Sequence, residues 1–242
     1  MLRYRNLLIL ILVLIAGGIY LNRAYAHIYS KFDSMTMPAA EVIQIDPMDT
    51  KKYVALGDSL TAGMGASNLE NSLPELIVSR FKSKGINYSI TNLAVPGAVS
   101  SDVVDKQLLP AVEQSASLAT VFIGTNDVHN FVSEKVFIDN LQAIVSQLKA
   151  SGRTNVVVIN LPYLGTDSLV LPPYNWYFDF QLGNFNNDIN GVCAKEQVQC
   201  LDLHAYSQKA FTDKSFYSAD EFHPSDKGYQ AWANFIADNI KL

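Results

Sequence analysis

Residues 53–65 read YVALGDSLTAGMG, and this stretch decides how the rest of the chain is interpreted. Its first four residues are apolar and end at a glycine, a pattern typical of a buried β-strand. An acid and a hydroxyl, Asp58 and Ser59, stand where the chain leaves the strand, and small residues follow as far as Gly65. Small residues leave room for another part of the molecule to approach the backbone. Ser59 is therefore a candidate nucleophile.

Apolar runs alternate with helical patterns along the rest of the chain. The apolar runs predict strands over residues 53–57, 87–94, 120–123, 155–161 and 198–203. Helical spacing and end signals predict helices near residues 72–84, 101–109, 133–151 and 229–240. The first of these starts with a capping-box pattern, Ser72 with Glu75. Such alternation indicates parallel strands with helices on both faces. We therefore expect one α/β domain, a three-layer α/β/α sandwich on a mostly parallel, about five-stranded, flavodoxin-like sheet.

Polar and small residues follow four of the predicted strands. In open parallel sheets, ligands bind at the carboxyl ends of the strands. These exits are Gly57-Asp58-Ser59, Pro96-Gly97, Gly124-Thr125-Asn126-Asp127 and Pro162-Tyr163. We expect all four segments to meet at one edge of the sheet.

A serine needs a base to become a nucleophile, and the base needs an acceptor that orients it. Of the four histidines, His27 lies near the N-terminus, outside the predicted domain. His223 has Asp220 three residues before it, so one turn can place the carboxylate on the imidazole Nδ1. Pro224 after it favours an extended backbone that projects the side chain from a fixed loop. His223 is therefore the expected base.

Two other histidines are alternatives for this role. His204 follows Asp202 by two residues, which would place both on one face of the fifth predicted strand. His129 lies just past the exit of the third strand, where it could reach the same edge or remain a solvated loop residue.

Several of these segments form a pattern in chain order. The pattern consists of GDSL at residues 57–60, Gly97 in a strand-exit turn, Asn126 within GTND, and Asp220 with His223 before the last helix. It resembles the motif blocks of the SGNH hydrolase superfamily, also called GDSL esterases or lipases. The resemblance spans roughly residues 51–240. Each motif alone is weak, and their order together is what makes the resemblance specific.

The resemblance implies that Ser59 is the nucleophile, that His223 is the base, and that Asp220 orients the base. It also implies an oxyanion hole made by the backbone N–H groups of Ser59 and Gly97 and the side-chain amide of Asn126. Glycine lets a backbone donor approach closely, and an amide is a neutral donor that does not ionise. If Asn126 instead bonds its own backbone as a turn residue, the third donor is lost.

The implied reaction is hydrolysis of a carboxylic ester through an acyl-serine intermediate, without a metal or a cofactor. Asp58 and Asp127 are expected to organise their loops. The alternatives are an extracytoplasmic O-acyltransferase or deacetylase acting on cell-envelope carbohydrate, and a non-catalytic domain that binds a glycan or a lipid. Residues 161–180, rich in aromatic residues and proline, are expected to form a long loop that either walls the substrate pocket or covers the sheet edge.

Composition narrows the range of partners. The chain has 242 residues, of which 49% are hydrophobic, and this suits a single domain with a packed core. The 18 Lys and Arg residues and the 23 Asp and Glu residues give a net charge of -5. This charge is a poor match for nucleic acid. We expect a small ester or acylated substrate and no nucleic-acid partner.

The N-terminus differs in kind from the rest of the chain. Arg3 and Arg5 precede an almost wholly apolar run over residues 7–21, and Ala24-Tyr25-Ala26 follows, as in an export leader. As a helix, that run reaches roughly 22 Å, short of the ~30 Å hydrocarbon core of a membrane. This favours a signal peptide cleaved after Ala26. Its strong hydrophobicity, with tilting or membrane thinning, leaves a membrane anchor as the alternative.

We therefore divide the chain into three segments. Residues 1–26 are a signal peptide or membrane anchor, residues 27–50 a tether, and residues 51–242 the SGNH hydrolase domain. The domain is expected outside the cytoplasm, either periplasmic or secreted, or anchored in the membrane by residues 7–21.

Only two cysteines occur, Cys193 and Cys200. An exported domain permits a disulfide between them, from the end of a helix to the next strand. The alternative is a pair of small buried side chains.

Overall fold

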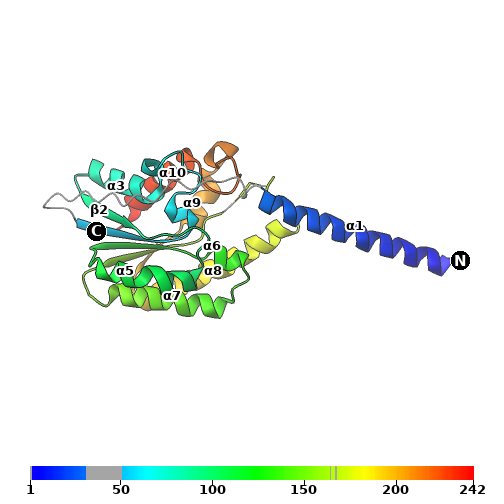
Figure 1. Cartoon of the computed structure of the whole chain (residues 1–242), viewed down its shortest axis with the longest axis horizontal. Coiled ribbons are helices and arrows are strands. Elements are labelled where there is room, and N and C mark those ends of the chain that lie inside the picture. The colour runs from blue at the N-terminus through cyan, green and yellow to red at the C-terminus, as the bar shows by residue number, and fades with distance from the viewer. Residues whose placement is uncertain (1, 31–50, 164, 167) are drawn as a thin grey trace.

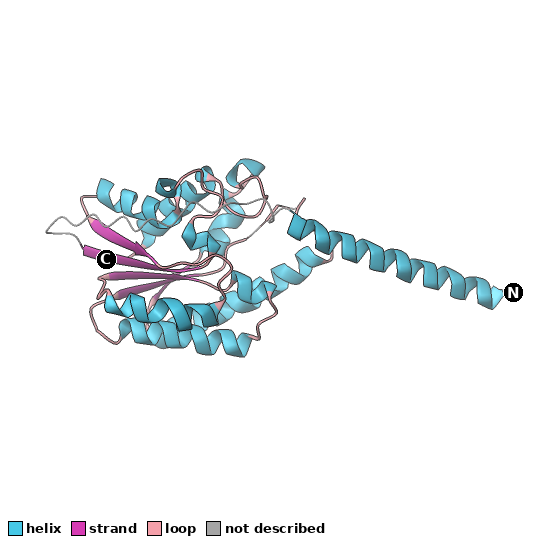
Figure 2. Ribbon diagram, viewed as in Figure 1, coloured by secondary structure: helices cyan, strands magenta, loops and turns pink. Residues whose placement is uncertain are grey.

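Five apolar runs form one parallel sheet in the computed structural model, which describes residues 2–30, 51–163, 165–166 and 168–242. The strands are β1 (Lys51–Gly57), β2 (Tyr88–Asn92), β3 (Leu118–Phe122), β4 (Asn155–Ile159) and β5 (Gln199–Leu201). They lie in the order β2-β1-β3-β4-β5, and every neighbouring pair is parallel (Figure 2). This is the flavodoxin-like order, so the predicted fold class is confirmed.

Helices cover both faces of the sheet (Figure 1). One layer contains α3 (Leu73–Ser83), α9 (Leu203–Ala210) and α10 (Asp226–Asn239). The other contains α4 (Ser100–Asp102), η2 (Val103–Gln107), α5 (Leu108–Glu113), α7 (Glu134–Lys149) and α8 (Tyr174–Glu196). Shorter helices lie in the connections: α2 (Ser59–Ala62), η1 (Leu69–Asn71), α6 (Thr125–His129) and η3 (Lys214–Phe216).

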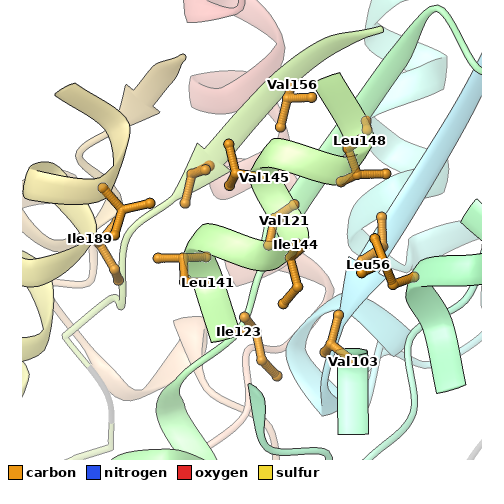
Figure 3. Close-up of a cluster of buried hydrophobic side chains, with 14 of the residues drawn as sticks. Leu56, Val103, Val121, Ile123, Leu141, Ile144, Val145, Leu148, Val156 and Ile189 are labelled. Atoms are coloured by element: carbon orange, nitrogen blue, oxygen red, sulfur yellow. The ribbon is translucent and has the colours of Figure 1, made fainter. Parts of the chain in front are cut away.

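Two apolar cores fill the spaces between the sheet and its helices. Alternate residues of a strand face opposite sides, so Val54 and Leu56 belong to one core and Tyr53 and Ala55 to the other. Figure 3 shows part of the first core, where side chains of the sheet and its strand ends meet those of α7, η2 and α8: Leu56, Val103, Val121, Ile123, Leu141, Ile144, Val145, Leu148, Val156 and Ile189. Burial on both faces explains the continuous apolar sequence of strands such as β4.

The predicted starts of two helices have different outcomes. Ser133 caps α7 as expected, because its hydroxyl accepts a hydrogen bond from Val136 N at 3.4 Å. Ser72 precedes α3, but its side chain makes no capping hydrogen bond, and the predicted capping box with Glu75 is wrong. The buried Ser72 side chain packs against Gly63, where an added Cβ would lie 2.5 Å from Ser72 Cβ. A side chain packed in this way is not available to the helix.

The prediction of a loop over residues 161–180 is wrong toward its end. α8 begins at Tyr174, directly after a pair of prolines. Apolar residues lie on more than one side of this helix, since Trp176 and Phe180 are exposed whereas Phe185 is buried. No single apolar stripe therefore marks the helix in the sequence.

The N-terminal segment is one continuous helix, α1 (Leu2–Ser30), which projects away from the domain (Figure 1). By length and composition, Asn6–Ile28 could cross a membrane, and a signal sequence near the N-terminus has the same character. Its 23 residues reach about 34 Å, more than the ~30 Å hydrocarbon core. The apolar run of residues 7–21 lies within this helix, which continues beyond it to Ser30. The first four residues of the predicted tether, 27–50, belong to α1, and residues 31–50 lie outside the described residues.

A disulfide joins Cys193 in α8 to Cys200 in β5, with 6.0 Å between their Cα atoms. This separation is typical of a bridge. Of the two alternatives left open by the sequence, the structure contains the disulfide.

No side chain fits at Gly57, where β1 ends. An added Cβ would collide with the carbonyl oxygen of Phe122 and with the hydroxyl of Thr61. Because Phe122 is paired with Gly57 across the sheet, a side chain at residue 57 would fit only if β1 and β3 moved apart.

Gly57→Ala is therefore expected to lower the free energy of unfolding of the full chain in detergent by about 1–3 kcal/mol. Chemical denaturation followed by circular dichroism measures this loss. Gly191→Ala is the matched control, because Gly191 is exposed within α8 and nothing lies within 4 Å of an added Cβ. It should raise stability by about 0.5–1 kcal/mol. Equal stability of Gly57→Ala and the wild type would contradict the close approach of the strands.

Candidate active site

Ser59 is the first residue of α2 and follows β1 almost directly. Asp58 caps this helix, since its Oδ1 accepts a hydrogen bond from Leu60 N at 3.0 Å. The Ser59 residue is 8% exposed. The strand-to-helix turn thus places a hydroxyl at the carboxyl edge of the sheet, as predicted.

A buried side-chain amide holds the strand end that precedes Ser59. Gly57 N donates to Gln107 Oε1 at 2.9 Å, and Gln107 Nε2 donates to Gly57 O at 2.9 Å. Sequence analysis missed Gln107. The available signal was its spacing, because the residues four positions before and after it, Val103 and Ala111, are buried and apolar. A polar residue in such a stripe needs a buried partner.

The small residues after Ser59 make room for the loop that carries His223. Gly65 has a φ of +92°, and a Cβ there would lie 2.6 Å from Pro224 O and 3.0 Å from His223 Cβ. This close approach requires glycine, and it explains why small residues follow Ser59 in the sequence.

Three buried side chains form a hydrogen-bonded chain at this edge. His223 Nε2 lies 2.9 Å from Ser59 Oγ, and His223 Nδ1 lies 2.5 Å from Asp220 Oδ2. If Nδ1 carries the hydrogen and donates it to the carboxylate, Nε2 can accept the hydrogen of the serine hydroxyl. The arrangement can therefore take a proton from Ser59.

Asp220 is held by several donors besides the imidazole. Its Oδ1 accepts from Ser218 Oγ at 2.6 Å, from Phe222 N at 2.9 Å and from His223 N at 2.9 Å. Burial opposes the charged carboxylate, but the hydrogen bonds from His223, Ser218 and Phe222 together outweigh it and lower the pKa of Asp220. The group is therefore a carboxylate at neutral pH and fixes the imidazole.

The other histidines are not part of the hydrogen-bonded group of Ser59, His223 and Asp220. The expectation that His204 shares a strand face with Asp202 is wrong, because β5 ends at Leu201 and Asp202 instead caps α9, accepting from Ala205 N at 3.0 Å. His129 lies in α6, where its ring stacks on Phe178 at 5.4 Å, and burial lowers its pKa.

His27 lies at the end of α1, with its Nε2 3.1 Å from Ser168 O. Among the residues that the structure describes, no group of three or more His, Cys, Asp or Glu side chains is placed to hold a metal ion.

Gly97 and Asn126 lie beside the end of β1. Val95 N donates to Gly57 O at 3.2 Å, and the turn that follows is closed by Ala98 N donating to Val95 O at 3.1 Å. Gly97 adopts a φ of +77° in this turn. Asn126 Nδ2 donates to Ala98 O at 3.0 Å. The structure therefore brings the two predicted oxyanion donors together at the edge that carries Ser59.

Asp127 organises the neighbouring loop, as expected. It accepts hydrogen bonds from Ser100 N at 2.9 Å and from Ser100 Oγ at 2.5 Å. Burial raises the pKa of Asp127, although these hydrogen bonds lower it in part. Asp58 is more strongly affected: burial raises its pKa to about 7, the Leu60 amide lowers it in part, and the charge of Asp127 raises it. Asp58 Oδ2 has no hydrogen-bond partner in the described part of the chain.

A largely apolar pocket opens next to this chain of side chains. Phe222 lines it, and the Phe222 ring lies 5.0 Å from that of His223. Further lining residues come from α1, α6, α8 and the described residues between 163 and 170: Ile28, Thr125, His129, Thr166, Val170 and Phe178. Part of the aromatic segment predicted from the sequence thus walls a pocket.

Comparisons with known proteins agree on one family. A family model described as the GDSL-like Lipase/Acylhydrolase family matches residues 55–231. An arylesterase of Vibrio mimicus is 25% identical over 195 residues, which are 79% of this chain and 88% of that protein. The spore germination lipase LipC of Bacillus licheniformis is 25% identical over 209 residues, 75% of this chain and 92% of that protein. The crystal structure of a lipase/acylhydrolase from Enterococcus faecalis has the same fold, with a TM-score of 0.67 at 21% identity over 79% of this chain and 95% of that one.

Gln107→Leu removes the bonds that hold Gly57, so Ser59 loses its fixed position. We expect its labelling by a fluorophosphonate probe to slow about tenfold or more, and the free energy of unfolding to fall by about 1–3 kcal/mol. Gel-based labelling time courses and denaturation measure the two effects.

Asn186→Leu is the matched control, because Asn186 makes the same paired bonds to a residue just past the end of β4: it accepts from Leu161 N at 2.8 Å and donates to Leu161 O at 2.9 Å. It should lose stability and keep the labelling rate. Equal labelling rates in the two variants would show that Gln107 does not position Ser59.

Asp58 gives a pH-dependent prediction. The pKa of Asp58 is about 7 in the folded state, above the ~3.9 of an unfolded chain. Between these two pH values the folded state holds a proton that the unfolded chain has released, so the free energy of unfolding falls as the pH rises through this range. Asp58→Asn keeps a capping oxygen and removes this titration. Between pH 5 and pH 7, the free energy of unfolding of Asp58→Asn should rise relative to that of the wild type by about 2–3 kcal/mol. A difference that does not change with pH would rule out a buried, protonated Asp58.

Proposed function

The chain belongs to the GDSL-like lipase/acylhydrolase family of ester-bond hydrolases, and on this premise we propose that it acts through an acyl-serine intermediate formed on Ser59. One observation carries the proposal: Ser59 Oγ is 2.9 Å from His223 Nε2, and His223 Nδ1 is 2.5 Å from Asp220. A nucleophile, a base and an orienting carboxylate in this order are what covalent ester hydrolysis requires.

In the first half-reaction, Ser59 Oγ attacks the ester carbonyl while His223 Nε2 takes the hydroxyl proton. The tetrahedral intermediate collapses when the imidazolium gives this proton to the leaving alcohol. Asp220, kept ionised by its hydrogen bonds, stabilises the imidazolium. In the second half-reaction, water attacks the acyl-serine with His223 again as the base, and the acid is released.

The negative charge on the carbonyl oxygen needs donors that are already in place. We assign this role to Ser59 N, Gly97 N and Asn126 Nδ2. The amide nitrogen of Asn126 has two hydrogens, and its bond to Ala98 O uses one of them and fixes the plane of the group. The second hydrogen then serves the oxyanion. An added Cβ at Gly97 would meet nothing within 4 Å, so the space beside its Cα is open.

The working location is outside the cytoplasm. The disulfide between Cys193 and Cys200 suits an oxidising compartment. Arg3 and Arg5 precede the apolar segment, and positive charge on this flank favours a cytoplasmic N-terminus. The domain that follows α1 is then placed on the opposite side of the membrane.

His223→Ala tests the assignment of the base. With p-nitrophenyl acetate as substrate, kcat should fall by about 10⁴-fold or more, as for other members of such triads. His204→Ala is the matched control, since His204 lies in α9 and should stay within a few-fold of the wild type. A second series with an added sugar acceptor measures transfer instead of hydrolysis. Equal losses in the two histidine variants would overturn the assignment, and product formed only with the acceptor would make the protein an acyltransferase.

A further inference from the structure

Part of the predicted leader is in contact with the folded domain. Tyr20 OH donates to Pro172 O at 3.0 Å, and Tyr174 OH donates to Leu21 O at 3.4 Å. Ala24 is 2% exposed. All these α1 residues precede the predicted cleavage site, so cleavage there would remove every one of these contacts. These contacts exist only while α1 remains attached to the domain.

The last turns of α1 also belong to the pocket beside the candidate active site. Ile28 is 2% exposed and lines that pocket together with Phe178 of α8 and Val170. Ile19, earlier in the same helix, is 53% exposed. The helix therefore has two parts, an exposed apolar part and an end that completes a cavity of the domain.

This pocket lies next to the proposed reaction centre. Phe222 and Thr125 line it, and each is the chain neighbour of a proposed active-site residue, His223 and Asn126 respectively. Thr166 N donates to Glu221 O at 3.0 Å, which ties the segment that walls the pocket to the His223 loop. A chain bound in the pocket would therefore lie beside the loop that carries His223.

The geometry of α1 places this pocket at a membrane surface. Ile28 is the last residue of the candidate membrane span Asn6–Ile28, and it also lines the pocket. α1 leaves the domain beside α6 and the start of α8, on the side where the strands end (Figure 1). If the exposed part of α1 spans a bilayer, the carboxyl edge of the sheet faces the lipid head groups.

We infer that α1 is retained in the working enzyme and forms one wall of the substrate pocket, so that the enzyme hydrolyses fatty-acyl esters drawn from the membrane that holds α1. This inference rests on the proposed function. The substrate is an amphiphile: its acyl chain occupies the pocket past Ile28 and Phe178, and its polar alcohol remains toward water. Hydrolysis breaks the acyl–oxygen bond, and one water supplies OH to the acid and H to the alcohol.

The test uses the full chain in phosphatidylcholine vesicles, with p-nitrophenyl acetate and p-nitrophenyl dodecanoate as substrates. Ile28→Ser should lower the ratio of kcat/KM for dodecanoate to that for acetate by about tenfold, because loss of one apolar contact in a pocket has an effect of this size. Ile28→Ala should lower the same ratio by less. Ile19→Ser is the matched control within α1 and should leave the ratio unchanged.

N-terminal sequencing of the membrane-bound protein completes the test. Retention of α1 predicts an intact N-terminus, and a mature protein that begins at His27 would overturn the inference. An unchanged ratio in Ile28→Ser, or an equal loss with both esters, would also overturn it. Failure of the proposed function is distinguishable, because it would appear as undiminished acetate hydrolysis in Ser59→Ala.

Discussion

The site depends on one constraint, the absence of a side chain at Gly57. β1 and β3 approach so closely there that a Cβ would collide with Phe122 O, and Gln107 bonds both the N–H and the C=O of Gly57. The strand end is therefore fixed by the sheet and by a buried amide. Ser59, two residues later, takes its place from this packing and not from a mobile loop. A position held by rigid elements is what a reacting group requires.

Topology explains how distant residues meet at this point. A parallel sheet gathers the exits of its strands at one edge, and the strand–helix alternation was enough to predict this edge from the sequence. The motif pattern singled out Ser59, Gly97, Asn126, Asp220 and His223, and the structure places all of them there. A hydrogen bond joins Ser59 and His223, although they lie 164 positions apart in the sequence. Their roles in catalysis are still predictions.

The features that could not be predicted from the sequence depend on tertiary contacts. Gln107 matters because of a strand 50 residues away, and Ser72 fails as a cap because it is packed against Gly63. Local patterns contain neither fact. The first turns of α8 have no apolar stripe that would mark them as a helix, because their aromatic residues are divided between the pocket, α1 and solvent. The expected strand face shared by Asp202 and His204 is wrong because β5 ends at Leu201, and sequence patterns locate such boundaries only to within a few residues.

Covalent transfer of the acyl group to Ser59 distinguishes a serine hydrolase from a protein that only binds esters. Rapid acid quench of the full chain during turnover of p-nitrophenyl acetate, followed by peptide mass spectrometry, measures this step directly. The acyl-serine mechanism predicts an added acetyl group on the peptide that contains Ser59, formed together with an initial release of nitrophenolate. Acetyl groups on another residue, with turnover undiminished in Ser59→Ala, would contradict it.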